Sequence, residues 1–171
     1  MKLETERKFL IVRPDGGLLT AQPGLTVREI VQTYLTAPEE EPERRIRRIT
    51  EDGRVSFVFT QKANGRKNGS AVSREETEYE ISPAEYDTLR RTAYSELTKT
   101  RYSFPYGDRV IEIDVYPDEI GGEALSGKAV LEVELEDGDE SVVLPPWITV
   151  LRELTGTKKF SNKALARRVR P

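Results

Sequence analysis

Glu4-Thr5-Glu6-Arg7-Lys8 lies within the first twelve residues, Met1–Val12, and its charges alternate in a way that suits a β-strand. Successive side chains of a strand point to opposite faces, so the even-numbered charged residues from Lys2 to Lys8 share one face. Two carboxylates and an ammonium group in one row can hold a divalent cation beside an anion. A solvated edge strand is the alternative, and the rest of the chain decides between the two.

The same alternation recurs along the chain. We expect strands at Met1–Val12, Arg28–Leu35, Glu43–Thr50, Arg54–Lys62, Ser73–Ile81, Leu97–Phe104, Arg109–Tyr116 and Ala129–Glu136. Tight turns such as Glu51-Asp52-Gly53 favour antiparallel neighbours. The sequence therefore predicts an α+β, mainly β protein built on an eight-stranded antiparallel sheet.

Three helices are expected among these strands, at 83–93, 146–154 and 161–169. The first has the clearest start, because Ser82 can cap the helix while Pro83 and Glu85 occupy favoured first-turn positions. The second follows Pro145-Pro146-Trp147. The chain is predicted to form a single domain over 1–171, with the third helix at its C-terminal end.

Composition excludes several kinds of chemistry. The 171 residues include no cysteine and no histidine, which rules out disulfides, Cys/His zinc sites and Ser-His-Asp triads. Catalysis must then use carboxylates, lysine, arginine, tyrosine, hydroxyls or a metal held by oxygen, which favours Mg²⁺, Mn²⁺ or Ca²⁺. The apolar run Phe9–Val12 is too short for a signal peptide, and no stretch is long enough to span a bilayer. We expect a cytoplasmic protein with no membrane partner.

The charged strand faces are not random mixtures. They collect the cations Lys8, Arg45, Arg47, Lys62, Arg74, Lys99 and Arg101 and the anions Glu4, Glu6, Glu76, Glu78, Glu112, Asp114, Glu132 and Glu134. A one-sided sheet with its charged face in water is one explanation. The other is a closed barrel with these faces inward and a few helices covering the apolar outer faces. A charged interior is costly unless it is paired or filled by ligands, so such a lumen suits a polyanion bridged to carboxylates by metal.

This ordered series resembles the CYTH superfamily, also called the triphosphate tunnel metalloenzymes, in its short, single-domain bacterial form. The resemblance begins at the ExExK motif and covers nearly the whole chain. It continues through Arg45-Ile46-Arg47, Lys62, Arg74-Glu75-Glu76-Thr77-Glu78, Lys99-Thr100-Arg101, Glu112-Ile113-Asp114 and Glu132-Val133-Glu134, and ends at Thr155-Gly156, Asn162 and Leu165-Ala166.

The resemblance implies an eight-stranded tunnel that binds triphosphates with Mg²⁺ or Mn²⁺. It implies metal-binding roles for Glu4, Glu6 and Glu134, with Glu132 beside them, and phosphate-binding roles for Lys8, Arg45, Arg47, Lys62, Arg74, Lys99 and Arg101. Glu76, Glu78, Glu112 and Asp114 are expected to support a second metal, orient the cations or position water. The candidates for activating water are Glu6, Glu78 and Asp114. The last helix is expected either to plug one mouth or simply to pack on the surface.

The expected activity is hydrolysis of inorganic tripolyphosphate to pyrophosphate and phosphate. Adenylate cyclase and thiamine triphosphatase activities on the same fold are alternatives, as is a non-catalytic polyphosphate-binding module. The binding module is disfavoured because it need not keep the metal-type carboxylates. The only tryptophan, Trp147, is expected to pack rather than to stack on a base.

Nucleic-acid binding is the last alternative. Its basis is the basic tail Lys158, Lys159, Lys163, Arg167, Arg168 and Arg170. The chain as a whole carries a net charge of −3, whereas duplex-binding domains are usually basic. We therefore expect no nucleic-acid partner, and a homodimer if an apolar outer strand face is left uncovered.

Overall fold

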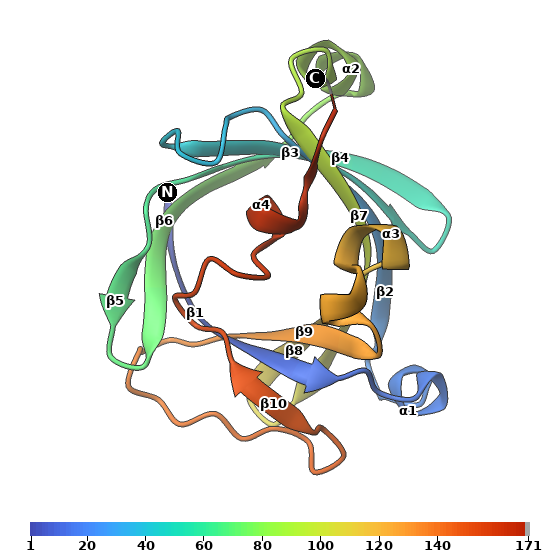
Figure 1. Cartoon of the computed structure of the whole chain (residues 1–171), viewed down its shortest axis with the longest axis vertical. Coiled ribbons are helices and arrows are strands. Elements are labelled where there is room, and N and C mark those ends of the chain that lie inside the picture. Colours follow the sequence, from blue (N-terminus) through green and yellow to red (C-terminus); the bar gives the residue numbers. More distant parts are fainter. Residues whose placement is uncertain (170–171) are drawn as a thin grey trace.

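The strand with the opening motif, β1 (Lys2–Val12), is paired along both edges, and this closes the sheet into a barrel. The computed structural model describes residues 1–169. Around the barrel the strands run β1-β9-β8-β7-β2-β3-β4-β6, and β6 pairs back to β1. Every pairing in this circuit is antiparallel. Figure 1 shows the ring that these strands form. The predicted eight-stranded closed barrel is confirmed.

The seven other barrel strands overlap their predicted segments. They are β2 (Thr26–Tyr34), β3 (Glu43–Glu51), β4 (Arg54–Lys62), β6 (Ala71–Glu80), β7 (Ser95–Tyr106), β8 (Arg109–Val115) and β9 (Lys128–Glu134). The β3–β4 turn has positive φ at both Asp52 (49°) and Gly53 (75°). Two such residues suit the twist of a two-residue hairpin loop.

Helices are few and short. The first expected helix, α2 (Pro83–Arg90), has the predicted capping box between Ser82 and Glu85. It ends at Arg90 rather than near 93, because the chain then turns and the Tyr94 amide donates to the carbonyl oxygen of Tyr34. Three short helical segments lie where loops were expected. These are α1 (Gly16–Thr20), α3 (Asp118–Gly121) and η1 (Glu123–Leu125).

The helix expected at 146–154 is wrong. This segment is extended and contains β10 (Val150–Glu153), which pairs with β1 from Phe9 to Ile11. β6 contacts β1 only from Lys2 to Glu6, so the same edge of β1 is open further along. An unpaired strand edge is a strong template for an extended segment, and here it overrides the local helical pattern.

The helix expected at 161–169 is also largely wrong. Only α4 (Asn162–Leu165) is helical, after which β11 (Arg167–Arg168) pairs with the start of β7. β8 joins β7 only from Thr100 onward, which leaves the edge near Ser95 free. The Arg168 guanidinium lies 3.9 Å from the centre of the Tyr94 ring, so the segment gains both edge pairing and a cation–π contact.

The apolar outer wall of β1, β7, β8 and β9 is covered mainly by the loop that leads to β10. Ile113, Leu131 and Val133 are almost fully buried there. Val142, Leu144, Trp147 and Ile148 from the loop pack on this cluster. On the opposite side α2 lies on β3 and β4, with the Tyr86 and Phe57 ring centres 4.7 Å apart. The wall is thus covered by a loop where helices were expected.

Trp147 is a packing residue, as the sequence predicted, and lies with its ring centre 5.8 Å from that of Phe104. We expect Trp147→Ala to lower the free energy of unfolding by about 2–3 kcal/mol, because the ring is only partly buried and relaxation limits the cavity. The KM for tripolyphosphate, the substrate expected from the sequence, should not change. Thermal unfolding and steady-state kinetics on the same variant test both statements; a large rise in KM with normal stability would contradict them.

A second apolar cluster fills one end of the barrel. Leu10, Tyr34, Leu97 and Val130 come from the barrel strands, at positions that continue the alternation of the inward faces, and Tyr116 directly follows β8. Leu125, Leu154 and Phe160 join them, and Leu165 and Ala166 pack against the cluster. Figure 1 shows α4 and the following segment across the opening of the ring. The C-terminal segment therefore closes this end, through a short turn rather than a long helix.

Candidate phosphate- and metal-binding site

The remaining lumen is a cavity of about 310 Å³ lined almost entirely by charged side chains. It contains every phosphate-binding and metal-binding candidate predicted from the sequence. The predicted residues on its wall are Glu4, Glu6, Lys8, Arg45, Arg47, Lys62, Arg74, Glu76, Glu78, Lys99, Arg101, Glu112, Glu132 and Glu134. The remaining candidate, Asp114, is fully buried behind this wall and bonded to two of the cations.

Strand register explains why residues so distant in sequence meet. Glu6 stands directly opposite Glu134 and Lys8 opposite Glu132 in the β1–β9 pair. On the other edge of β1, Glu4 stands opposite Arg74. Directly opposite residues share a face of the sheet. The alternation in each strand therefore brings its charged residues into one lumen.

The lumen charges are largely paired. Lys62 Nζ lies 2.5 Å from a carboxylate oxygen of Glu4 and 2.8 Å from one of Glu76. Lys8 Nζ lies 3.0 Å from Glu132 and 3.8 Å from Glu6. Burial alone would lower the pKa of Lys8, but Glu132 and Glu6 outweigh it and raise that pKa. Lys8 is therefore a permanent cation in the lumen.

Arg101 is the centre of the most buried cluster. Its guanidinium donates to both oxygens of Asp114, at 2.6 and 2.8 Å, to Glu132 at 3.0 Å, and to Glu112. Lys99 Nζ donates to Asp114 at 2.6 Å, and burial together with the neighbouring Arg101 lowers the pKa of Lys99 to about 8. Asp114 thus holds two phosphate-binding candidates in place.

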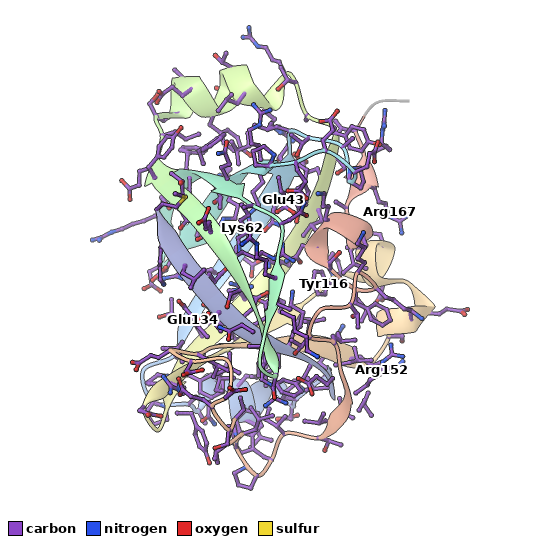
Figure 2. All side chains as sticks on the ribbon, turned by 90° about the vertical axis from the view of Figure 1, so that its left-hand side faces the viewer. Glu43, Lys62, Tyr116, Glu134, Arg152 and Arg167 are labelled. Carbon is purple, nitrogen blue, oxygen red and sulfur yellow. The ribbon has the colours of Figure 1, made fainter. Side chains whose placement is uncertain are left out.

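Several lumen residues were not singled out from the sequence. Glu43 precedes Arg45 on the same face of β3 and lies 3.6 Å from it. Lys163 reaches Glu43 at 3.7 Å from the C-terminal segment. Strand alternation could have identified Glu43, whereas Lys163 was counted only in the basic tail, and Arg170 of that tail lies outside the described residues. Figure 2 shows Glu43 near Lys62, with Glu134 toward the side away from the C-terminal segment.

Three arginines of the lumen have a donor atom that the protein does not use. The Nε atoms of Arg45, Arg47 and Arg74 are buried and have no hydrogen-bond partner among the described residues. Burial and the neighbouring Arg45 lower the pKa of Arg47 to about 10, although Glu78 opposes this. Unsatisfied buried donors are costly. These arginines line the lumen, and a phosphate chain bound there would relieve the repulsion between the guanidinium groups of Arg45 and Arg47.

The carboxylates Glu4, Glu6, Glu132 and Glu134 have the donor chemistry of a hard divalent cation, because every available ligand atom is oxygen. In residues 1–169 no three of the acidic side chains already converge as a metal cage. Instead Glu4 is held by Lys62, and Glu134 by Lys2 at 2.6 Å. The donor set therefore fits such an ion, which would compete with these ammonium groups.

The pKa of Glu6 is shifted in the opposite direction from that of Glu132. Burial raises its pKa, and the nearby carboxylates of Glu132 and Glu4 raise it further, against the attraction of Lys8. The pKa of Glu132 is instead well below its ordinary range, because Lys8 and Arg101 outweigh the effect of burial. Glu6 is therefore the more basic of these two lumen carboxylates.

A closed barrel with this lumen defines a class of protein that binds polyanions inside a tunnel. The chain belongs to the CYTH domain family, whose model matches residues 2–168. Membership of this family implies a divalent metal ion and a small triphosphate-containing ligand. In the part of the chain that the structure describes, no helix is long and apolar enough to cross a membrane.

Known proteins agree with this assignment. The chain is 34% identical over 167 residues to the inorganic triphosphatase of Nitrosomonas europaea, covering 95% of this chain and 96% of that protein. The crystal structure of an inorganic triphosphatase matches with a TM-score of 0.57 and 29% identity, covering 97% of this chain and 95% of the other. A Pyrococcus horikoshii protein shares the fold, with a TM-score of 0.55, 19% identity and 77% of each chain covered.

Proposed function

We propose that the protein hydrolyses inorganic tripolyphosphate to pyrophosphate and orthophosphate, with Mg²⁺ or Mn²⁺ as cofactor. The observation that carries this proposal is a small lumen lined both by the seven lysines and arginines expected to bind phosphate and by a row of carboxylates. The 34% identity to an inorganic triphosphatase supports the same substrate.

The arginines and lysines bind the phosphate chain. Arg45, Arg47 and Arg74 line the lumen, and forked guanidinium groups bind phosphate oxygens in fixed orientations. Lys8 and Lys62 supply compact positive charges beside the carboxylates. Together they spread the charge of the substrate and hold the scissile anhydride in one position.

The cofactor is proposed to bind at Glu4, Glu6 and Glu134, with Glu132 beside them. When bound, a divalent ion neutralises charge that develops on phosphate oxygens during phosphoryl transfer. Glu76 and Glu112 are supporting residues that hold Lys62 and Arg101, respectively. They keep these cations aimed at the substrate.

Glu6 is proposed to accept the proton of the attacking water. Of the three candidates, Asp114 has both oxygens occupied by Arg101 and Lys99. Glu78 accepts from Arg47 at 2.6 Å and from Thr60 at 2.8 Å. Glu6 faces the cavity, and its contact with Lys8, at 3.8 Å, is longer than the hydrogen bonds that occupy the other two candidates. Water attacks the terminal phosphorus, the P–O bond to the leaving pyrophosphate breaks, and Glu6 takes the proton of the water, which leaves orthophosphate as the second product.

Phosphate release from tripolyphosphate, ATP and thiamine triphosphate, each with Mg²⁺, Mn²⁺ or EDTA, tests the proposal. We expect metal-dependent release from tripolyphosphate and at least about tenfold slower release from the organic substrates, a discrimination of about 1.4 kcal/mol or more in transition-state binding. Cyclic AMP and pyrophosphate from ATP would instead indicate a cyclase. Tight tripolyphosphate binding in EDTA with no release from any substrate would indicate a binding module. The homodimer and the cytoplasmic location stay predictions.

A further inference from the structure

Lys2 is a cation of the lumen to which the proposed function assigns no role. It precedes Glu4 by two positions on β1, so both side chains lie on the inward face, and it stands opposite Glu76 in the β1–β6 pair. Its side chain lines the same cavity as the phosphate-binding and metal-binding candidates. Lys2 therefore has the two properties that a phosphate-binding residue needs here, a positive charge and access to the lumen.

Lys2 forms an exposed ion pair with Glu134 at the open end of the lumen. The Nζ atom of Lys2 donates to Oε1 of Glu134 at 2.6 Å, and the two side chains are 68% and 51% exposed. Figure 2 shows Glu134 on the side of the barrel away from the C-terminal segment, which closes the other end. Ion pairs in such exposed positions contribute little to stability, because water screens them and both side chains lose conformational freedom. This pair can therefore open at little cost.

We propose that Lys2 is a substrate-binding residue, which Glu134 holds until a divalent cation binds this carboxylate and which then binds a phosphate group at the open end. The inference rests on the proposed function, in which Glu134 is a ligand of the cofactor. The ammonium group of Lys2 and a divalent ion repel each other if both remain on one carboxylate. The flexible stem of a lysine lets the ammonium group move while the backbone of Lys2 stays paired with β6.

The other carboxylates beside Lys2 already have a partner. Lys62 Nζ lies 2.5 Å from an oxygen of Glu4 and 2.8 Å from an oxygen of Glu76. An ammonium group that leaves Glu134 therefore has the anionic substrate as its available partner at the open end. Cofactor and substrate then strengthen each other's binding, because both favour the same position of Lys2.

Mn²⁺ binding without substrate tests the first half of this exchange. Lys2→Met keeps a long unbranched side chain and removes the charge, whereas Glu134→Gln removes the contested carboxylate. By electron paramagnetic resonance of free Mn²⁺, we expect Lys2→Met to bind Mn²⁺ roughly two- to fivefold more tightly than the natural protein, the effect of removing a competing exposed ion pair. The double variant should bind Mn²⁺ no more tightly than Glu134→Gln. An unchanged affinity in Lys2→Met, or equal tightening in both backgrounds, would overturn the proposal.

Binding of a non-hydrolysable imido analogue of tripolyphosphate at saturating Mn²⁺ tests the second half. By calorimetric titration we expect roughly five- to tenfold weaker binding by Lys2→Met, because a charge-assisted hydrogen bond to phosphate is lost. Lys67→Met is the matched control, since Lys67 on β5 (Arg66–Asn68) is exposed and does not line the lumen. It should bind the analogue as the natural protein does. Equal affinities in Lys2→Met and Lys67→Met would overturn the substrate contact.

Both titrations are separable from catalysis, because neither requires cleavage of a phosphate bond. If the natural protein binds Mn²⁺ and the analogue but releases no phosphate from tripolyphosphate, the proposed function fails, and the titrations still decide the role of Lys2. If the natural protein binds no Mn²⁺, the exchange at Glu134 is overturned together with the proposed cofactor. Thermal unfolding of Lys2→Met and Lys67→Met should be alike, as for other exposed side chains. A loss of stability confined to Lys2→Met would indicate a structural role instead.

Discussion

Glu6→Gln is expected to reduce metal-dependent phosphate release from tripolyphosphate by about 10²–10⁴-fold, the range associated with loss of a general base. Glutamine keeps the shape of the side chain but can neither accept the proton nor bind the cofactor as an anion. The fold should remain intact. Glu6 is repelled by Glu132 and Glu4, and Lys8 keeps its closer partner Glu132 at 3.0 Å.

Glu75→Gln is the matched control for this substitution. Glu75 lies on the exposed outer face of β6, opposite Leu3, so it carries the same chemical change outside the lumen. Its turnover should equal that of the natural protein. Thermal unfolding of both variants separates a loss of catalysis from a loss of structure. Unaltered turnover in Glu6→Gln would contradict the assignment of Glu6 to the site.

Asp114→Asn is expected to lower the free energy of unfolding by about 3–5 kcal/mol at pH 7, because it leaves Arg101 and Lys99 buried without their shared carboxylate. Asp114 is fully buried and accepts hydrogen bonds from both cations. The variant should also bind tripolyphosphate more weakly, since the two cations lose the group that orients them. Denaturant unfolding measures the first effect and calorimetric titration the second.

The pKa of Asp114 determines how the loss of stability in Asp114→Asn changes with pH. Burial would raise the pKa of Asp114, but Arg101 and Lys99 outweigh it and hold that pKa below its usual value. The stabilisation is therefore present above the unfolded pKa of about 3.9 and is lost as pH falls through the lower folded pKa. The difference in unfolding free energy between the natural protein and Asp114→Asn should shrink below about pH 4.

Asp87→Asn is the control for Asp114→Asn, because Asp87 is exposed on α2. Exposed substitutions usually change stability by less than about 0.5 kcal/mol. A cost for Asp114→Asn as small as that of Asp87→Asn would show that the buried cluster contributes little. A difference that grows on acidification would contradict the assigned protonation state.

The candidate lumen residues could be found from sequence because strand alternation is a local property. Once Glu4 and Glu6 share a face of β1, and Glu132 and Glu134 share a face of β9, closing the sheet brings all four into one cavity. The roles within that cavity could not be read in the same way. The raised pKa of Glu6 comes from burial and from neighbours as far away as Glu132.

The two wrong helices have a common cause. The stretches that became β10 and β11 look helical in isolation, yet each pairs with a strand edge that the barrel leaves open, on β1 and on β7. Secondary structure in short segments depends more on available partners than on intrinsic propensity. Such an edge exists only after distant strands have paired. The local sequence of residues 146–169 therefore could not predict that these segments would form strands.

By itself, the sequence determined the strands of the barrel, the identity of the inward faces and the exclusion of histidine and cysteine chemistry. Only the tertiary structure decided which charges pair, how the outer wall is covered, and where the apolar cluster closes the lumen. The alternation of residue types and the composition can be read directly from the sequence, because they do not depend on which strands pair. Ion pairs such as Lys62 with Glu4, and the pairing of β10 with β1 beyond the end of β6, arise from the register between strands far apart in sequence.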